Sequence, residues 1–244
     1  MRTNRNCLCY KSRTPLMSPN GQVEIMLGAA LYTGEERAAY LRGRVGDDTG
    51  DNMSAQNGLY GSLTGLYWVW KNVASGFKSV HTYRLFWAQE SIEPVQGTIY
   101  VPERTETIVV DGGARVTDIM GQYGHVHGSV LMDLLWATCR RVDLGITPEM
   151  VDSLAAQTRM YPFNMFMADA RSFDLLCGRL FGVLFALQGR YSYLVPHLEA
   201  ATGQARQFDF LAERVLHLLL DNIGSFLPGH RVEELPIVNI PATQ

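Results

Sequence analysis

The chain has 244 residues, of which 47% are hydrophobic and 18% are charged, and its formal net charge is −3. This composition excludes a disordered chain, because it supplies enough apolar side chains for a large core. A slightly acidic chain without a basic stripe also argues against a nucleic-acid-binding protein.

In the first half of the chain, strand-like and helix-like segments follow one another. Apolar residues at helical spacing predict helices, and short apolar runs predict buried strands. The expected elements are a strand at 23–31 that runs into a turn, a helical or irregular segment at 34–44, a polar loop at 46–57, a helix at 59–72, and strands at 78–87, 98–101 and 107–110.

The second half is richer in helices. Thr147 before Pro148 is typical of a helix start, with the threonine as N-cap and the proline at the first helical position. The expected elements are helices at 130–141, 148–158, 172–187 and 208–220 and a short strand at 163–167.

This alternation predicts one α/β domain with a sheet layered by helices. We expect the domain at 23–220, preceded by a poorly defined segment at 1–22 and followed by a tail at 221–244. No signal peptide opens the sequence, and the longest apolar run, 175–187, is shorter than the ~20 residues of a membrane span. We therefore expect a cytoplasmic protein, whose basic first residues could touch the inner face of the cell membrane.

The densest polar cluster is an acidic loop that contains Asp47, Asp48, Asp51 and Asn52. Such a loop could bind a cation or hydrogen-bond the ribose and uracil of a nucleotide. Taken alone, the pattern favours a solvated turn followed by a helix cap.

His81 and Arg84 lie on an expected strand that ends in Phe86 and Trp87. A guanidinium at the end of an α/β strand can bind a diphosphate through two hydrogen bonds. Without further information, polar surface residues of an edge strand explain this pair better.

Glu213 and Arg214 lie near the start of the expected helix at 208–220. A glutamate with apolar neighbours can act as a general base with a raised pKa, although a glutamate that pairs with the helix dipole is commoner. Adjacent helical positions point in different directions, so we expect no ion pair between these two side chains.

No metal site is predicted. His125 and His127 could supply two ligands, but no third ligand stands at a recognised spacing. The four cysteines also lack the spacing of zinc knuckles, and we expect them to be free thiols.

Six blocks of sequence together resemble a known family. They are GAAL at 28–31, DDTGDNMS at 47–54, LTGLYWVWKN at 63–72, HTYRLF at 81–86, NMFM at 164–167, and a segment at 206–216 with Phe210, Glu213 and Arg214. In this order and spacing they resemble the DUF4422 family of bacterial capsular and exopolysaccharide synthesis proteins, which includes galactofuranosyltransferase-type enzymes.

The chain departs from the family pattern at four places, one of which is Tyr10-Lys11, where the family has His-Lys. Ser62 stands where the family has glutamate, Asp209 stands where it has glycine, and the block at 81–86 lacks one of the family's basic side chains. These departures keep an alternative open, in which the protein is a catalytically degenerate, nucleotide-sugar-binding subunit of a polysaccharide assembly complex. A metal-dependent hydrolase built on the acidic loop and His125 and His127 is a third possibility.

The resemblance implies a GT-A-like, Rossmann-like domain with a central, mostly parallel sheet flanked by helices. It implies a glycosyltransferase that moves a hexose, galactofuranose included, from a UDP-sugar to a glycan, which is expected to be lipid-linked. Contact with the membrane or with other polysaccharide-assembly proteins would follow from such an acceptor.

The resemblance also implies roles for the candidate residues. Glu213 would be the catalytic base, with Asp209 as the next candidate, and His81, Arg84 and Arg214 would stabilise charge on UDP. The strand with His81 and Arg84 stands where many GT-A enzymes carry a metal-binding Asp-x-Asp, so cationic side chains could replace some or all of the metal's charge. The metal requirement stays open. The residues expected to orient the nucleotide or the donor sugar are Asp47, Asp48, Asp51 and Asn52.

Overall fold

The computed structural model describes residues 4–10, 23–82, 85–88, 92–110, 112–203 and 205–239, with the backbone alone at 4–10, 198, 201 and 202.

A central sheet crosses the molecule. Its strands lie in the order β3 (Val45–Gly46), β2 (Val23–Met26), β1 (Asn4–Tyr10), β4 (Phe77–Thr82), β11 (Phe166–Asp169), β6 (Thr98–Pro102) and β12 (Arg231–Leu235). Along this path β11 is antiparallel to both of its neighbours, and the other strands run in one common direction. Beside it, β5 (Leu85–Trp87) pairs antiparallel with β4 and with β13 (Ile237–Asn239). This mixed α/β arrangement confirms the predicted fold class.

The sheet extends beyond the predicted domain bounds of 23–220 at both ends. β1 lies between β2 and β4 in the middle of the sheet, although 1–22 is expected to be a poorly defined segment. β12 pairs with β6 over five residues, although 221–244 is expected to be a tail. The sequence prediction is therefore too narrow, because both strands are short and lack a clear apolar alternation.

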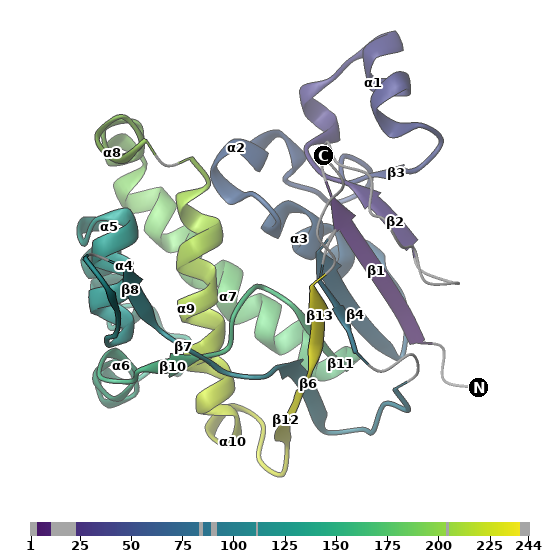
Figure 1. Cartoon of the computed structure of the whole chain (residues 1–244). Coiled ribbons are helices and arrows are strands. Elements are labelled where there is room, and N and C mark those ends of the chain that lie inside the picture. The colour runs from purple at the N-terminus through teal and green to yellow at the C-terminus, as the bar shows by residue number, and fades with distance from the viewer. Residues whose placement is uncertain are drawn as a thin grey trace.

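Helices lie on both sides of this sheet, and most of them gather beside its β6–β12 half (Figure 1). Near the amino-terminal strands are α1 (Gly34–Leu41), α2 (Asn57–Tyr60) and α3 (Leu63–Asn72). The remaining helices are α4 (Ile119–His127), α5 (Val130–Cys139), α6 (Pro148–Ala155), α7 (Ala170–Tyr191), α8 (Val195–Thr202), α9 (Gln207–Asp221) and α10 (Ile223–Phe226), and the short 3-10 helices are η1 (Ala29–Leu31), η2 (Ser54–Gln56) and η3 (Ser192–Leu194).

Side-chain caps explain where several helices begin. The Thr147 hydroxyl accepts a hydrogen bond from the Met150 backbone N–H at 3.3 Å, with Pro148 at the first helical position, as the sequence predicts. The Asp169 carboxylate accepts one from the Ser172 backbone N–H at 3.0 Å and starts α7 directly from β11. Helix α7 then forms the centre of the core, and its Cys177 is a buried free thiol, as is Cys139 on α5.

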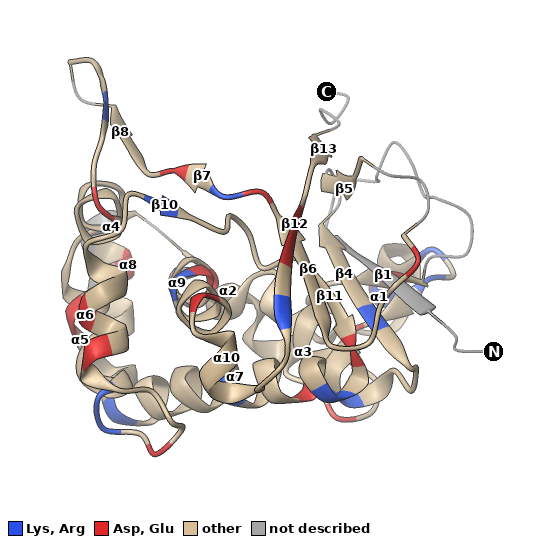
Figure 2. Ribbon diagram, turned by 90° about the horizontal axis from the view of Figure 1, so that it is seen from below, with Lys and Arg blue, Asp and Glu red and all other residues tan. Residues whose placement is uncertain are grey.

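Two small antiparallel pairs lie outside the central sheet. β7 (Thr105–Glu106) pairs with β10 (Arg159–Met160), and β8 (Ile108–Val110) pairs with β9 (Ala114–Val116). The second pair projects from the body of the molecule (Figure 2). Within the described residues, no helix combines the length and the apolar character needed to cross a membrane.

Candidate functional site

The strand order reverses at the carboxyl ends of β1 and β4, which is where the topology predicts a ligand crevice. The chain runs from β1 outward to β2 and β3 and then crosses back to β4 on the other side of β1. In open α/β sheets, ligands bind at such a reversal of strand order, beyond the carboxyl ends of the strands. Arg84, which follows β4, lies outside the described residues, as do residues 11–22, which follow β1.

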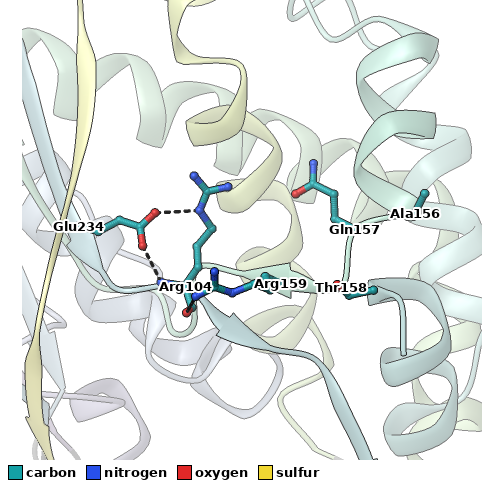
Figure 3. A pocket seen from close by; sticks show the side chains of 6 residues that line it. All are labelled: Arg104, Ala156, Gln157, Thr158, Arg159 and Glu234. Atoms are coloured by element: carbon teal, nitrogen blue, oxygen red, sulfur yellow. Dashed lines mark hydrogen bonds and ion pairs between the residues drawn. The ribbon is translucent and has the colours of Figure 1, made fainter. Parts of the chain in front are cut away.

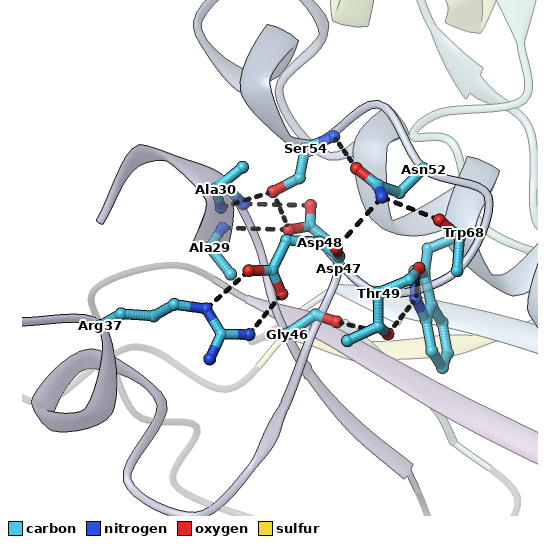
Figure 4. Close-up of polar contacts among 12 residues, drawn as sticks. Ala29, Ala30, Arg37, Gly46, Asp47, Asp48, Thr49, Asn52, Ser54 and Trp68 are labelled. Carbon is cyan, nitrogen blue, oxygen red and sulfur yellow. Dashed lines mark hydrogen bonds and ion pairs between the residues drawn. The ribbon is translucent and has the colours of Figure 1, made fainter. Parts of the chain in front are cut away.

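Asp47 organises the turn at one border of this crevice. Its carboxylate is fully buried and accepts hydrogen bonds from the backbone N–H groups of Gly28 and Ala29, both at 3.0 Å. It also accepts one from the Ser54 hydroxyl (Figure 4). The first carboxylate of the acidic loop therefore stabilises the 28–31 turn and is not exposed to a ligand.

Asp48 also stabilises the protein itself. Arg37 on α1 donates two hydrogen bonds to its carboxylate, at 2.6 and 2.8 Å (Figure 4). This pairing is the main reason why the pKa of Asp48 lies below its usual value. The ion pair attaches α1 to the loop that follows β3.

Asp51 and Asn52 are the exposed members of the same loop. The Asn52 amide donates to the backbone carbonyls of Asp48 and Gly50 at 3.1 and 3.0 Å, and its oxygen accepts from the Ser54 N–H. The Asp51 carboxylate accepts a hydrogen bond from the Tyr67 hydroxyl at 3.1 Å. Of the loop residues singled out in the sequence, these two present side chains to the solvent.

His81 lies inside the sheet and not at its surface. Its ring is 2% exposed, packs against the rings of Phe86 and Trp87, and shares a 2.9 Å hydrogen bond with the Ser79 hydroxyl. Burial lowers its pKa to about 4, so the ring is neutral at pH 7. The ring is therefore covered by Phe86 and Trp87, and a role of His81 in stabilising charge on UDP stays a prediction.

On the other side, helix α9 carries a row of polar side chains one turn apart. Asp209, Glu213 and His217 recur every four residues and face the segment 161–164, which leads into β11. The Tyr161 N–H donates to the His217 ring at 3.4 Å, and the Phe163 N–H donates to the Glu213 carboxylate.

This segment places the row at the carboxyl edge of the sheet. β11 is antiparallel to β4, with Phe166 opposite Val80. Extending this register by two residues brings Asn164 level with Thr82, where β4 ends. The Asn164 amide donates to the carbonyl and the carboxylate of Asp209 at 3.0 and 3.1 Å. The polar row of α9 therefore borders the same edge as the crevice.

Glu213 has the properties of a general base. Its side chain is 21% exposed, and burial of the carboxylate raises its pKa to about 7, an effect that the positive charge of Arg214 opposes and the negative charge of Asp209 reinforces. A carboxylate with a pKa near neutral pH can both accept and release a proton.

Arg214 holds Glu213 and is closed off from the solvent. Its guanidinium donates to the Glu213 carboxylate at 2.8 Å, to the Phe210 carbonyl at 2.9 Å and to the Gln122 side chain at 2.5 Å, and its side chain is 3% exposed. The prediction that these neighbours form no ion pair is wrong, because the long arginine folds back along the helix. Its geometry supports a positioning role and not a contact with the nucleotide.

Two departures from the family pattern contact each other. The Ser62 hydroxyl donates to the Asp209 carboxylate at 2.6 Å, and the Ser62 N–H donates to it at 3.2 Å. In the family pattern, position 62 is glutamate and position 209 is glycine. In this chain the carboxylate of the pair belongs to Asp209, and position 62 is serine. The two departures therefore lie in contact with each other, which the linear sequence does not reveal.

The described residues contain no group of three or more histidine, cysteine, aspartate and glutamate side chains that could hold a metal ion. His127 is buried, and its ring stacks on Phe210 with the ring centres 4.3 Å apart. The spacing of His125 and His127 therefore reflects a core contact at His127.

A family model described as "Domain of unknown function (DUF4422)" matches residues 8–223. The chain belongs to the DUF4422 family. The comparison with curated proteins gives no match.

One solved structure similar to the chain is described as the WbbM bifunctional glycosyltransferase in its apo form. The TM-score is 0.65 and the sequence identity is 17%, with 97% of this DUF4422 chain covered. The chain spans 45% of the length of that protein. At this identity the likeness shows the fold, which is the GT-A-like fold that the sequence predicts.

Proposed function

We propose that this DUF4422 protein transfers a hexose from a UDP-sugar to a hydroxyl group of an acceptor glycan in capsular or exopolysaccharide synthesis. UDP-galactofuranose is the donor that the family resemblance favours. The observation that carries the proposal is Glu213, a partly exposed carboxylate with a pKa of about 7 at the carboxyl edge of a sheet whose fold is shared with a glycosyltransferase.

In the proposed reaction the acceptor hydroxyl oxygen attacks C1 of the donor sugar, and Glu213 takes the hydroxyl proton. The bond between C1 and the diphosphate oxygen breaks, and UDP leaves with the bonding electron pair. Arg214 and the Phe163 N–H orient the Glu213 carboxylate for this step. A base held in place in this way contributes about 10²–10⁴ in rate.

On the donor side, we assign nucleotide contacts to Asp51 and Asn52, whose side chains are exposed next to the turn that Asp47 stabilises. Arg84, directly after β4, is proposed to pair with the diphosphate. A charge-assisted bond of this kind would offset the negative charge that develops on the leaving group, whether or not a divalent metal takes part.

On the acceptor side, Asn164 supports the proposal. Its amide oxygen is buried and has no hydrogen-bond partner among the described residues, while its amide nitrogen is bound to Asp209. A buried acceptor without a donor is unfavourable unless a ligand supplies one. A hydroxyl group of the acceptor sugar has the required chemistry. A lipid-linked acceptor would bring the protein to the inner face of the membrane.

The test measures donor binding and turnover on the same protein. We expect UDP and UDP-hexoses to raise the melting temperature, with ADP and GDP as controls. We also expect UDP to be released from a UDP-hexose when an acceptor glycan is present. An unchanged melting temperature at saturating UDP would contradict the donor assignment. UDP binding without acceptor-dependent release would indicate a binding subunit, and release of free sugar without an acceptor would indicate a hydrolase.

A further inference from the structure

A polar hollow lies between the end of the central sheet and helix α6, separate from the crevice at β1 and β4. Its volume is about 540 Å³, within the usual range for ligand sites. The residues that line it come from the segments that follow β6 and α6, from β10 and from β12 (Figure 3). It is lined by Arg104, Ala156, Gln157, Thr158, Arg159 and Glu234.

The charges in the hollow are balanced. The Glu234 carboxylate accepts hydrogen bonds from the Arg104 side chain at 2.8 Å and from the Arg104 N–H at 3.0 Å, and these bonds and the nearby charge of Arg159 keep its pKa below its usual value despite partial burial. A second carboxylate, Asp221 on α9, lies 3.5 Å from the Arg104 guanidinium. The lining therefore holds two guanidinium groups and one carboxylate, and the Asp221 carboxylate beside the lining balances the remaining positive charge.

This balance determines which ligands fit. A phosphate or a sugar acid would meet the ionised Glu234, which repels it. A neutral sugar has hydroxyl groups that each donate and accept, and it can use the carboxylate as an acceptor and the exposed Arg159 guanidinium and Thr158 hydroxyl as donors. The Arg159 guanidinium donates one hydrogen bond to the Arg104 carbonyl, at 3.0 Å, which holds it at the rim.

A chain of hydrogen bonds connects the hollow to the row of polar residues on α9. Gln157 donates to the Asp221 carboxylate at 2.9 Å, and its amide oxygen lies 3.1 Å from the His217 ring nitrogen. His217 is one turn of α9 from Glu213, a rise of about 6 Å along the axis. These bonds connect Gln157, which lines the hollow, to a buried residue of α9 one helical turn from the proposed base.

We propose that this hollow binds uncharged sugar units of the acceptor glycan, next to the unit whose hydroxyl is activated at Glu213. The inference rests on the proposed function for its place in the reaction. Saccharide binding in the hollow follows from its own residues.

A bacterial glycan array that carries neutral, uronic-acid-containing and phosphate-containing oligosaccharides tests the proposal. The full chain is compared with Arg159→Ala, an exposed position whose loss should leave the fold intact, and with Glu234→Gln. Arg115→Ala, an exposed arginine on another short strand, is the matched control. We expect binding to neutral oligosaccharides that weakens about tenfold or more in both hollow variants and is unchanged in the control.

The proposal is overturned if no neutral glycan binds, if only acidic or phosphorylated glycans bind, or if Arg159→Ala binds like the control. UDP binding, measured on the unaltered protein by thermal shift, separates the two claims. UDP binding without glycan binding would contradict saccharide binding in the hollow and would leave the proposed transferase function in place. Neutral-glycan binding at Arg159 without UDP binding removes the transferase and leaves a saccharide site.

Discussion

Burial of Glu213 sets the pH range in which this residue can act. Its pKa is raised from the usual value of a glutamate to about 7, because the carboxylate loses water on the inner side of α9. Below pH 7 the carboxyl group is mostly protonated and cannot accept a proton, so the transfer rate should rise with pH through about 7 and then level off. Well below pH 7 we expect about a tenfold loss per pH unit. A rate independent of pH between 5 and 8 would contradict this assignment.

The side chain itself can be tested without changing its shape. Glu213→Gln removes the basic oxygen and should lower sugar transfer by at least about a hundredfold, while the melting temperature and UDP binding stay near their original values. The matched control is Glu149→Gln, at an exposed position in the first turn of α6. Near-normal transfer by Glu213→Gln would move the base to another residue, with Asp209 as the next candidate.

The acidic loop contains both structural and exposed carboxylates, and two substitutions separate them. Asp47→Asn places an amide nitrogen against buried N–H donors, so we expect it to lower the free energy of unfolding by at least about 2 kcal/mol. Asp51→Asn, at an exposed site, should stay within about 0.5 kcal/mol and should weaken UDP binding instead. Urea denaturation and UDP titration of both variants provide the measurement. Equal stability of the two would contradict the structural role of Asp47.

Among the elements, α2 contacts both α3 and α9. The predicted helix at 59–72 is broken at Gly61, which has a positive φ of 51° and lets the chain turn between α2 and α3. A Cβ atom at this position would come within 2.4 Å of the Asp209 carboxylate. The glycine therefore permits the close contact through which Ser62 binds Asp209.

This contact predicts an unusual pattern of stability. Ser62→Glu alone places a second carboxylate beside the buried Asp209 and should destabilise the fold by about 1–3 kcal/mol. The double variant Ser62→Glu with Asp209→Gly, which restores the family pattern, should recover part of this loss, even though glycine costs α9 about 1 kcal/mol. A urea double-mutant cycle measures the coupling. Strictly additive effects would show that the two positions do not compensate.

At the scale of the whole molecule, the elements with strong local signals could be predicted from the sequence. The apolar helices α5 and α7 and the capped start of α6 at Thr147 lie where the pattern places them, whereas the single strand predicted at 78–87 is divided into β4 and β5, which pair antiparallel. The sequence pattern does not predict helix α4, because its glycines and histidines give little helical periodicity. The expected strand at 107–110 exists as β8, but it belongs to a projecting hairpin and not to the central sheet.

The candidate site was less predictable, because its contacts join residues far apart in the chain. Glu213 is a candidate from sequence, yet its pKa depends on the segment at 161–164 that covers it. The burial of His81 follows from Phe86 and Trp87, which fold back against it. The polar hollow has no sequence motif at all, since it forms where β6, β12 and the end of α6 meet.

Strand β12 forms one edge of the central sheet. β12 covers β6 through a parallel ladder that runs from Arg231 opposite Thr98 to Leu235 opposite Pro102, and Leu235 packs on Tyr100. A chain that ends at Gly229 would leave β6 with unpaired backbone groups and exposed apolar side chains.

We therefore expect the shortened chain to lose more than about 3 kcal/mol of unfolding free energy and to associate through the open edge, as measured by urea denaturation and size-exclusion chromatography. Val238→Thr, at an exposed position of β13, is the control and should stay within about 0.5 kcal/mol. A shortened chain that unfolds at the same urea concentration as the full chain and remains monomeric would show that β12 is dispensable. The predicted end of the domain at residue 220 would then describe the folding unit better than a sheet that includes β12 does.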